Sequence, residues 1–205
     1  MRAGTTATRV TAGAVLLALL IAQTALAGPA TDQLKTEIER VIRTLEDPGL
    51  KGAEKTEERR KAIRRASDGI FDWKEMAQRA LGRHWQTRTE AEREEFPGLF
   101  ADLLEHSYIT RIEQYSGEKI TYAGESVDGD QATVRTRMIT RQGQEVPIDY
   151  RMIRRGDRWL VYDVTVEGVS LVSSYRTQFN KIIQTSSYQE LVKRIKSQSL
   201  PKSEG

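Results

Sequence analysis

The spacing of apolar residues changes abruptly after Tyr115, and this change limits the possible fold more than any other feature of the chain. Before it, apolar residues recur every three or four positions, which is the spacing of one helical face. After it, apolar and polar residues alternate through four runs, as in strands with one buried face. Beyond Gly168 the helical spacing returns. The chain is therefore predicted to be α+β, with a four-stranded antiparallel meander sheet covered by helices.

Turn residues and helix-capping signals set the predicted boundaries. The strands are expected at 119–126, 131–140, 146–154 and 158–166, with Asp128-Gly129 as a hairpin turn. The helices are expected at 31–45, 57–65, 73–85, 89–115 and 169–183, followed by a short helix that opens at Ser187. Asp72 with Glu75 has the spacing of a capping box. Pro97 predicts a kink or a restart within the 89–115 helix.

Alternation assigns the strand residues to two faces of the sheet. The apolar face is predicted to carry Ile120, Tyr122, Val134, Met138, Ile148, Tyr150, Met152, Leu160, Tyr162, Val164 and Val166. The opposite face is predicted to carry Lys119, Arg135, Arg137, Asp149 and Arg151. Ile153, Trp159 and Val161 interrupt this polarity, which indicates that part of the outer face is covered.

Residues 1–27 have the pattern of a cleaved secretory signal peptide. Arg2 and Arg9 precede an apolar run, and Ala25-Leu26-Ala27 has the small residues of a cleavage site. The remainder, 28–205, is long enough for one domain with one core. The chain has no cysteine, so neither a disulfide nor a lipid anchor on cysteine is possible. These features predict a periplasmic protein without a stable membrane anchor.

Charge and composition exclude several classes of function. The chain has 32 basic and 29 acidic residues, and the predicted signal contains two of the basic ones, so the mature protein is nearly neutral. Such a balance gives no general attraction to nucleic acid. The two histidines, His84 and His106, have no metal-site spacing, and no nucleotide-binding fingerprint occurs. Neither a metal nor a cofactor is predicted.

No catalytic group stands out in the sequence. Ser170 follows Gly168-Val169, but residue 172 is valine where a nucleophile elbow needs glycine, so Ser170 is interpreted as a helix-start residue. One enzymatic alternative remains, a cone-shaped sheet in which Asp163 acts with Tyr162 or Tyr150. Because Asp163 alternates onto the face opposite Tyr162, a protein that is not an enzyme is favoured.

Three ordered blocks carry a family resemblance. "FDWKEMAQRALGRHW" (71–85), the T-x-x-E-R opening at Thr89–Arg93, and "VYDVTVEGVSLVSSYRTQF" (161–179) resemble the MlaC family, also called the toluene-tolerance family, over nearly all of the mature chain. Pro97 departs from the family pattern. The resemblance implies a periplasmic shuttle for phospholipid between an outer-membrane lipoprotein complex and an inner-membrane ABC transporter with an MCE-domain ring. By the same resemblance, this transport is expected to maintain outer-membrane lipid asymmetry. A hopanoid-associated role and a lipid-independent adaptor are the alternatives.

The resemblance also implies an apolar pocket between sheet and helices that holds the acyl chains. Periodicity alone is equally consistent with an ordinary filled core. Shielding some 30 methylenes of two acyl chains is worth about 24 kcal/mol at roughly 0.8 kcal/mol each, so the pocket volume is expected to be near or above roughly 1,000 Å³. Its predicted lining is Phe100, Leu103, Leu104, Tyr108, Ile112, Val134, Met138, Ile148, Tyr150, Met152, Tyr162, Val164, Val166, Val169, Leu171, Val172, Tyr175 and Phe179. Arg176 is the predicted contact for a headgroup or a partner.

Overall fold

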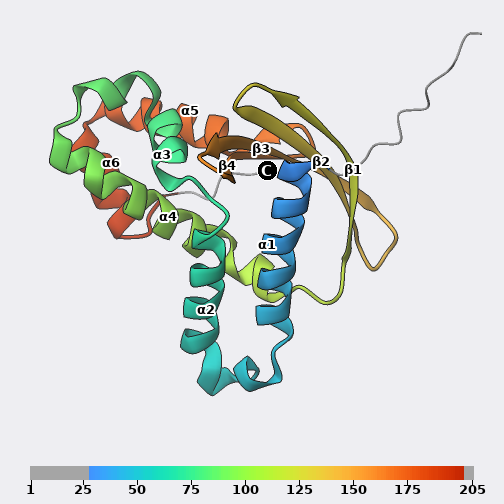
Figure 1. Cartoon of the computed structure of the whole chain (residues 1–205). Coiled ribbons are helices and arrows are strands. Elements are labelled where there is room, and N and C mark those ends of the chain that lie inside the picture. Colours follow the sequence, from blue (N-terminus) through green and yellow to red (C-terminus); the bar gives the residue numbers. More distant parts are fainter. Residues whose placement is uncertain (1–27, 201–205) are drawn as a thin grey trace, which may run out of the picture.

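The computed structural model describes residues 28–200, which form an antiparallel sheet with helices packed around it (Figure 1). The signal peptide predicted at 1–27 lies outside the described residues. The helices are α1 (Pro29–Glu46), α2 (Thr56–Asp68), α3 (Trp73–Leu81), α4 (Glu90–Glu113), α5 (Leu171–Thr185) and α6 (Tyr188–Lys196). The strands are β1 (Lys119–Asp128), β2 (Gln131–Ile139), β3 (Glu145–Arg155), β4 (Arg158–Val166) and β5 (Val169–Ser170), hydrogen-bonded in that order.

The predicted α+β class and the antiparallel meander are confirmed, but the described sheet has five strands and not four. The extra strand arises because Glu167 and Gly168 both have positive φ angles, 50° and 85°, and turn the chain back on itself. Val169 then pairs with Val166, and the helix predicted from 169 begins at Leu171. Ser170 accepts a hydrogen bond from the Ser173 amide, which confirms its role at the helix start.

The structure bears on two predicted features of the helices. The 73–85 helix ends at Leu81, because Gly82 adopts a φ of 52° and the chain continues as a 3₁₀ helix, Gly82–Thr87. Helix α4 runs through Pro97 without a restart, and the alternative of a kink there stays a prediction. Proline removes one backbone donor within the helix. The fully buried Phe96 and Phe100 on either side hold this segment in the core.

A bulge at Tyr162 divides β4 into two parts that face differently. Arg151 pairs with Asp163 and Met152 pairs with Val161, so Tyr162 is an extra residue without a cross-strand partner. Val161 therefore joins the face of Met152, and Tyr162 turns to the opposite side. The predicted placement of Tyr162 on the apolar face with Val164 is wrong because regular alternation stops at this bulge.

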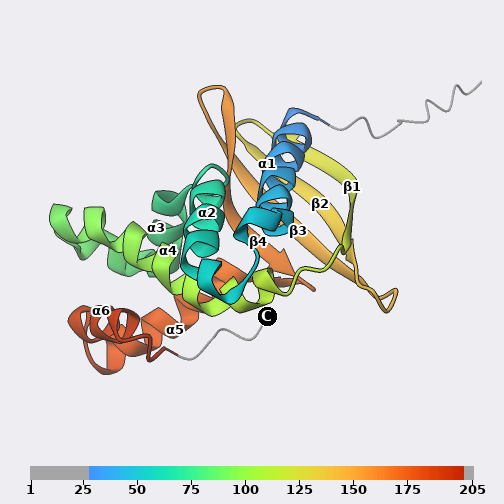
Figure 2. The ribbon, with the colours of Figure 1, turned by 90° about the horizontal axis from the view of Figure 1, so that it is seen from below.

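The two sides of β4 belong to two cores. One core joins sheet residues to helix α1 and includes Leu34, Val134, Met152 and Val161. The other lies among α3, α4, α5 and α6, with Tyr162 as its buried residue from the sheet. Figure 2 shows α1 lying across the strands and α3 to α6 grouped beside β4. Strand β4 is thus shared by both cores.

Side-chain hydrogen bonds fix α1 against the sheet. The Glu125 carboxylate accepts from the amide and the hydroxyl of Thr31, at 2.7 and 2.6 Å, in the first turn of α1. The Gln33 side chain exchanges two hydrogen bonds with the backbone of Trp159. A bulge in β1 between Tyr122 and Gly124 precedes Glu125, which faces Val134 across the ladder. This contact leaves α1 in a fixed position over one part of the sheet.

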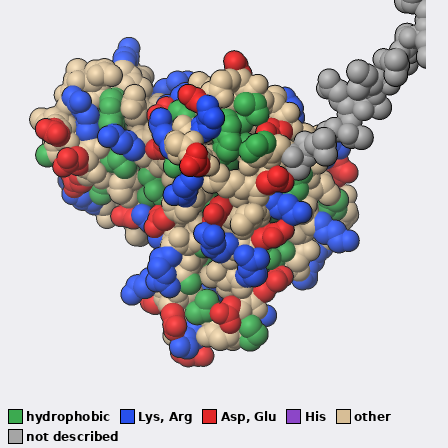
Figure 3. Space-filling model, in the orientation of Figure 1, with side chains coloured by type: hydrophobic (Ala, Val, Ile, Leu, Met, Phe, Trp, Pro, Cys, Tyr) green, Lys and Arg blue, Asp and Glu red, His purple; other side chains and the backbone are tan. Residues whose placement is uncertain are grey.

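The described surface has no single-sign face in the view of Figure 3, where basic and acidic side chains are interspersed. This agrees with the near balance of 32 basic and 29 acidic residues. No helix within residues 28–200 combines the length and the apolar character needed to cross a lipid bilayer.

Candidate functional site

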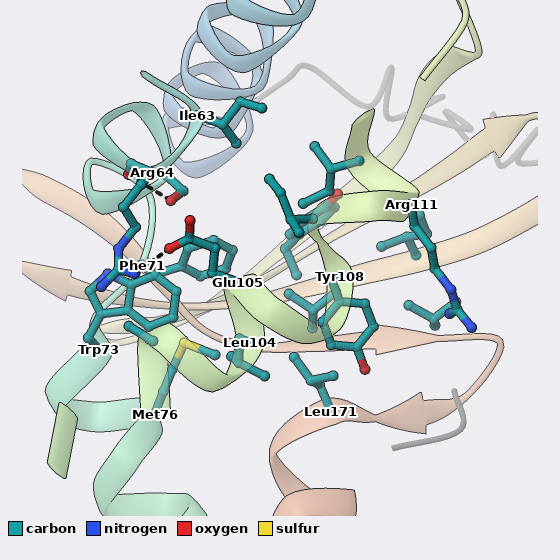
Figure 4. A pocket seen from close by; sticks show the side chains of 18 of the residues that line it. Ile63, Arg64, Phe71, Trp73, Met76, Leu104, Glu105, Tyr108, Arg111 and Leu171 are labelled. Carbon is teal, nitrogen blue, oxygen red and sulfur yellow. Dashed lines mark hydrogen bonds and ion pairs between the residues drawn. The ribbon is translucent and has the colours of Figure 1, made fainter. Parts of the chain in front are cut away.

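An apolar cavity of about 420 Å³ lies between the sheet and helices α2, α3 and α4. Figure 4 shows it with Trp73, Leu104 and Tyr108 among the side chains around it. Its lining is Ile63, Arg64 and Ser67 of α2, Phe71, Trp73 and Met76 around the start of α3, Ala101, Leu104, Glu105, Tyr108, Ile109, Arg111 and Ile112 of α4, and Met138, Val146, Ile148, Tyr150, Val164, Val166, Val169, Leu171 and Ser174 of the sheet and α5. Most of these side chains offer only hydrocarbon to a ligand.

Regular geometry brings the lining residues together. Ile148 and Tyr150 of β3 pair with Val166 and Val164 of β4, so the four side chains form one row on the same face. In α4, residues at intervals of four, such as Leu104, Tyr108 and Ile112, stand above one another on one side of the helix. The cavity is the space between this helical stripe and the sheet row.

Part of the predicted lining surrounds this cavity. These residues are Leu104, Tyr108, Ile112, Met138, Ile148, Tyr150, Val164, Val166, Val169 and Leu171. They come from the second half of α4, the ends of the strands near the β2–β3 turn, and the β4–α5 corner. As contacts for a bound ligand they remain a prediction.

The rest of the predicted lining lies in the two filled cores and does not line this cavity. Phe100, Leu103, Tyr162, Val172, Tyr175 and Phe179 pack in the helical core. Val134 and Met152 pack under α1 in the other core. The physical reason is that α1 covers the far half of the sheet, and that α5 after its first turn packs against α3 and α6.

Several lining residues were not predicted, above all those of α2. This helix is strongly charged, and Ile63 and Ala66 are its buried apolar residues, so its sequence gives only a weak core signal. Phe71 and Met76 have the spacing of a hydrophobic staple around the start of α3, which indicated packing but not a cavity. Trp73 donates its indole N–H to Asp68, which orients the ring at the cavity wall.

The cavity is smaller than predicted from the sequence. Its volume of about 420 Å³ lies in the lower part of the ligand-pocket range of roughly 300–1,000 Å³. The predicted figure of roughly 1,000 Å³ came from the need to shield two whole acyl chains from water. The helical core and α1 fill part of that space.

Ion pairs attach α2 to α4 along one side of the cavity. Arg64 contacts Glu105 at 2.7 Å and Asp102 at 2.9 Å. Near the other end of α2, Arg59 and Arg60 bind the two oxygens of Glu113 at 2.9 and 3.0 Å. Hydrogen bonds from Arg60 and then Arg59 lower the pKa of Glu113 against the opposing effect of burial. Ion pairs therefore join this wall to α4.

Two exposed apolar residues of the lining indicate where the cavity reaches the surface. Ile112 at the end of α4 is 36% exposed, and Val169 at the β4–β5 turn is 44% exposed. Both line the cavity. Inside it, burial raises the pKa of Tyr150, so its hydroxyl stays protonated at neutral pH.

The two polar residues singled out from the sequence lie away from this opening. Arg176 is exposed, with its side chain against Gly82 and a long hydrogen bond of 3.4 Å to Ser173. Asp163 is 3% exposed, and its oxygens accept from the Ser170 hydroxyl and the Val172 amide, at 2.6 and 3.0 Å. These bonds join β4 to the start of α5, and neither residue lines the cavity.

Known proteins resemble this chain in fold and in sequence. The solved structure of a phospholipid-binding protein from Ralstonia solanacearum, in complex with a phospholipid, superposes with a TM-score of 0.72 at 24% identity, covering 82% of this chain and 95% of that one. The intermembrane phospholipid transport system binding protein MlaC of Haemophilus influenzae is 29% identical over 99 residues, which is 46% of each chain. The match thus spans about half the length of that relative. The family model for MlaC protein matches residues 35–197, and the chain belongs to the MlaC family.

Proposed function

We propose that this protein binds phospholipid in the periplasm, with the acyl chains in the cavity, and carries it between an outer-membrane lipoprotein complex and an inner-membrane MCE/ABC transporter complex. The observation that carries the proposal is the apolar cavity of about 420 Å³ opening between exposed Ile112 and Val169, in a chain of the MlaC family. Apolar walls are needed because each exposed methylene costs about 0.8 kcal/mol. The protein would act by binding alone, without catalysis.

Two acyl chains are proposed to enter together, and this requires the cavity to widen. Its present volume is in the lower part of the usual range for ligand pockets. Helix α2 is the wall with the fewest buried apolar residues among the helices around the cavity, because it contributes only Ile63 and Ala66 to the buried set. Exchange of the ion pair between Arg64 and the exposed Asp102 for water costs little. We therefore expect α2 to move when lipid enters.

A matched pair of substitutions on β2 tests the cavity. Met138 lines it, and Ile139 is the next residue on the same strand and does not line it. Neighbouring strand residues point to opposite faces of the sheet. Met138→Lys places a charge among the acyl chains, whereas Ile139→Lys places it outside. We expect lipid to co-purify with the wild type and with Ile139→Lys, and to be lost by at least about tenfold from Met138→Lys.

The measurement is native mass spectrometry and lipid extraction on exported protein purified without detergent, with circular dichroism to verify folding. A two-chain phospholipid supports the proposal. Co-purification of a polycyclic hopanoid would identify a hopanoid as the cargo. A wild-type protein that contains no lipid yet binds a transporter complex would favour the adaptor function. Equal lipid retention in folded Met138→Lys and Ile139→Lys would show that this cavity is not the site. Transfer of labelled lipid to the purified transporter complex tests the shuttle itself.

A further inference from the structure

The cavity has three charged lining residues, and one of them lacks a charged partner. Arg64 and Glu105 bind each other, and Arg64 also contacts Asp102 and Asp68. Arg111 makes no ion pair or side-chain hydrogen bond with any residue between 28 and 200 that the structure describes; its guanidinium lies 6.0 Å from the centre of the Tyr108 ring. Arg111 is thus the charged group of the lining that remains available to a ligand.

Arg111 lies at the opening of the cavity. It is in the last turn of α4, directly before Ile112, whose exposed side chain marks the opening together with Val169. Figure 4 shows Arg111 on the opposite side of the cavity from Arg64, beyond Tyr108. If the apolar chains of a ligand lie inside the cavity, the polar group attached to them would protrude from the opening beside Arg111.

The charge around Arg111 is suited to an anion. Glu113, two residues further on, is bound by both Arg59 and Arg60, so its negative charge is largely offset. Glu105, six residues earlier, is paired with Arg64, which it shares with Asp102 and Asp68. Arginine presents a planar set of donors that matches phosphate oxygens. A phosphate at this position gains a partner without displacing an existing one.

We propose that Arg111 binds the phosphate of the phospholipid whose acyl chains fill the cavity, and that it makes the protein prefer phosphate-bearing lipids over neutral lipids with the same chains. This inference rests on the proposed function. A single exposed arginine holds a free anion weakly. Acyl chains anchored in the cavity keep the lipid phosphate at a high local concentration beside Arg111. The contact between Arg111 and the phosphate therefore contributes measurably to lipid affinity. Arg176, the residue predicted from the sequence for this role, lies against Gly82 instead.

The test compares two ligands and three proteins. Lipid-free protein is titrated by displacement of a fluorescent lipid, using phosphatidylglycerol and diacylglycerol with identical acyl chains. The proteins are the wild type, Arg111→Gln and the matched control Arg176→Gln, which removes a second exposed arginine away from the cavity. We expect the wild type and Arg176→Gln to prefer phosphatidylglycerol by about five- to tenfold. Arg111→Gln should lose this preference and keep the wild-type affinity for diacylglycerol.

Other results would overturn either the role of Arg111 or the proposed function. Equal binding of both lipids by the wild type, or an unchanged preference in Arg111→Gln, overturns the role of Arg111 and leaves the proposed function intact. A wild type that binds neither lipid overturns the proposed function itself. Inorganic phosphate at millimolar concentration should not displace the lipid. Displacement that requires Arg111 would overturn the assignment to a lipid phosphate, because it would identify a site for the free anion.

Discussion

The Asp163 carboxylate shows how one buried residue positions a helix. It accepts hydrogen bonds from the Ser170 hydroxyl and the Val172 amide, and Arg151 lies 3.9 Å away across the ladder. The amide of Val172 is one of the donors at the start of α5 that have no partner within the helix. The residue considered from the sequence as a catalytic acid therefore fixes the corner between β4 and α5.

Replacement of Asp163 should lower stability more than replacement of a comparable aspartate. Asp163→Ala leaves a buried amide and a hydroxyl without acceptors, so we expect the free energy of unfolding to fall by about 2–4 kcal/mol. Asp149→Ala, on the outer face of neighbouring β3, should change it by less than about 0.5 kcal/mol. Urea unfolding measures both values. Equal losses for the two variants would contradict the role assigned to Asp163.

Single residues of the site could be predicted where they continue a regular pattern. Tyr108 and Ile112 follow the helical stripe, and Ile148 follows the strand alternation, so the sequence placed all three beside the cavity. Tyr162 could not be placed correctly, because the strand pattern does not mark the bulge before Asp163, and Tyr162 is buried in the helical core. Arg111 gave no signal, since an exposed arginine at a helix end is an ordinary feature.

At the scale of elements, α2 packs along α1 and is joined to α4 by arginines. Glu113 of α4 forms ion pairs with Arg59 and Arg60, and the side chains of Arg59 and Glu113 are mostly shielded from water. Because hydrogen bonds from Arg60 and Arg59 lower the pKa of Glu113, the ionised carboxylate is the form that stabilises the fold. The sequence predicted α2 as a helix but not its place at the cavity, since charged residues give no core signal.

Acid should release this attachment. A lowered pKa in the folded state means that the stabilisation is complete above the unfolded pKa of roughly 4.3 and is lost as the pH falls through the lower folded value. We expect Glu113→Gln to reduce the free energy of unfolding by about 1–3 kcal/mol at pH 7. The difference from wild type should shrink below about pH 4.3 and disappear in stronger acid.

Urea unfolding across this pH range gives the comparison, and Glu94→Gln on the same helix is the control. Glu94 is exposed and makes no ion pair within the described residues 28–200. A difference between Glu113→Gln and wild type that stays constant down to strong acid would show that the ion pairs are not its cause.

For the molecule as a whole, the class of fold follows from the sequence, but the cavity does not. The change of period after Tyr115 predicted helices and then an antiparallel sheet, which the structure contains. A filled core and an open cavity need the same apolar residues, so Phe100 and Leu104 look alike in the sequence. In the structure, Phe100 is fully buried in the helical core, whereas Leu104 also reaches the cavity. Only packing separates them.

The bulge at Tyr162 has a consequence for changes in chain length. Because Tyr162 has no cross-strand partner, Val161 in the first part of β4 packs under α1, while Asp163 is hydrogen-bonded to the start of α5. Deleting Tyr162 would rotate Trp159 and Val161 away from α1, whereas Tyr162→Phe keeps both the spacing and the ring. We expect the deletion to abolish cooperative thermal melting and the phenylalanine variant to retain it. A deletion variant that melts like the wild type would mean that this strand tolerates either spacing.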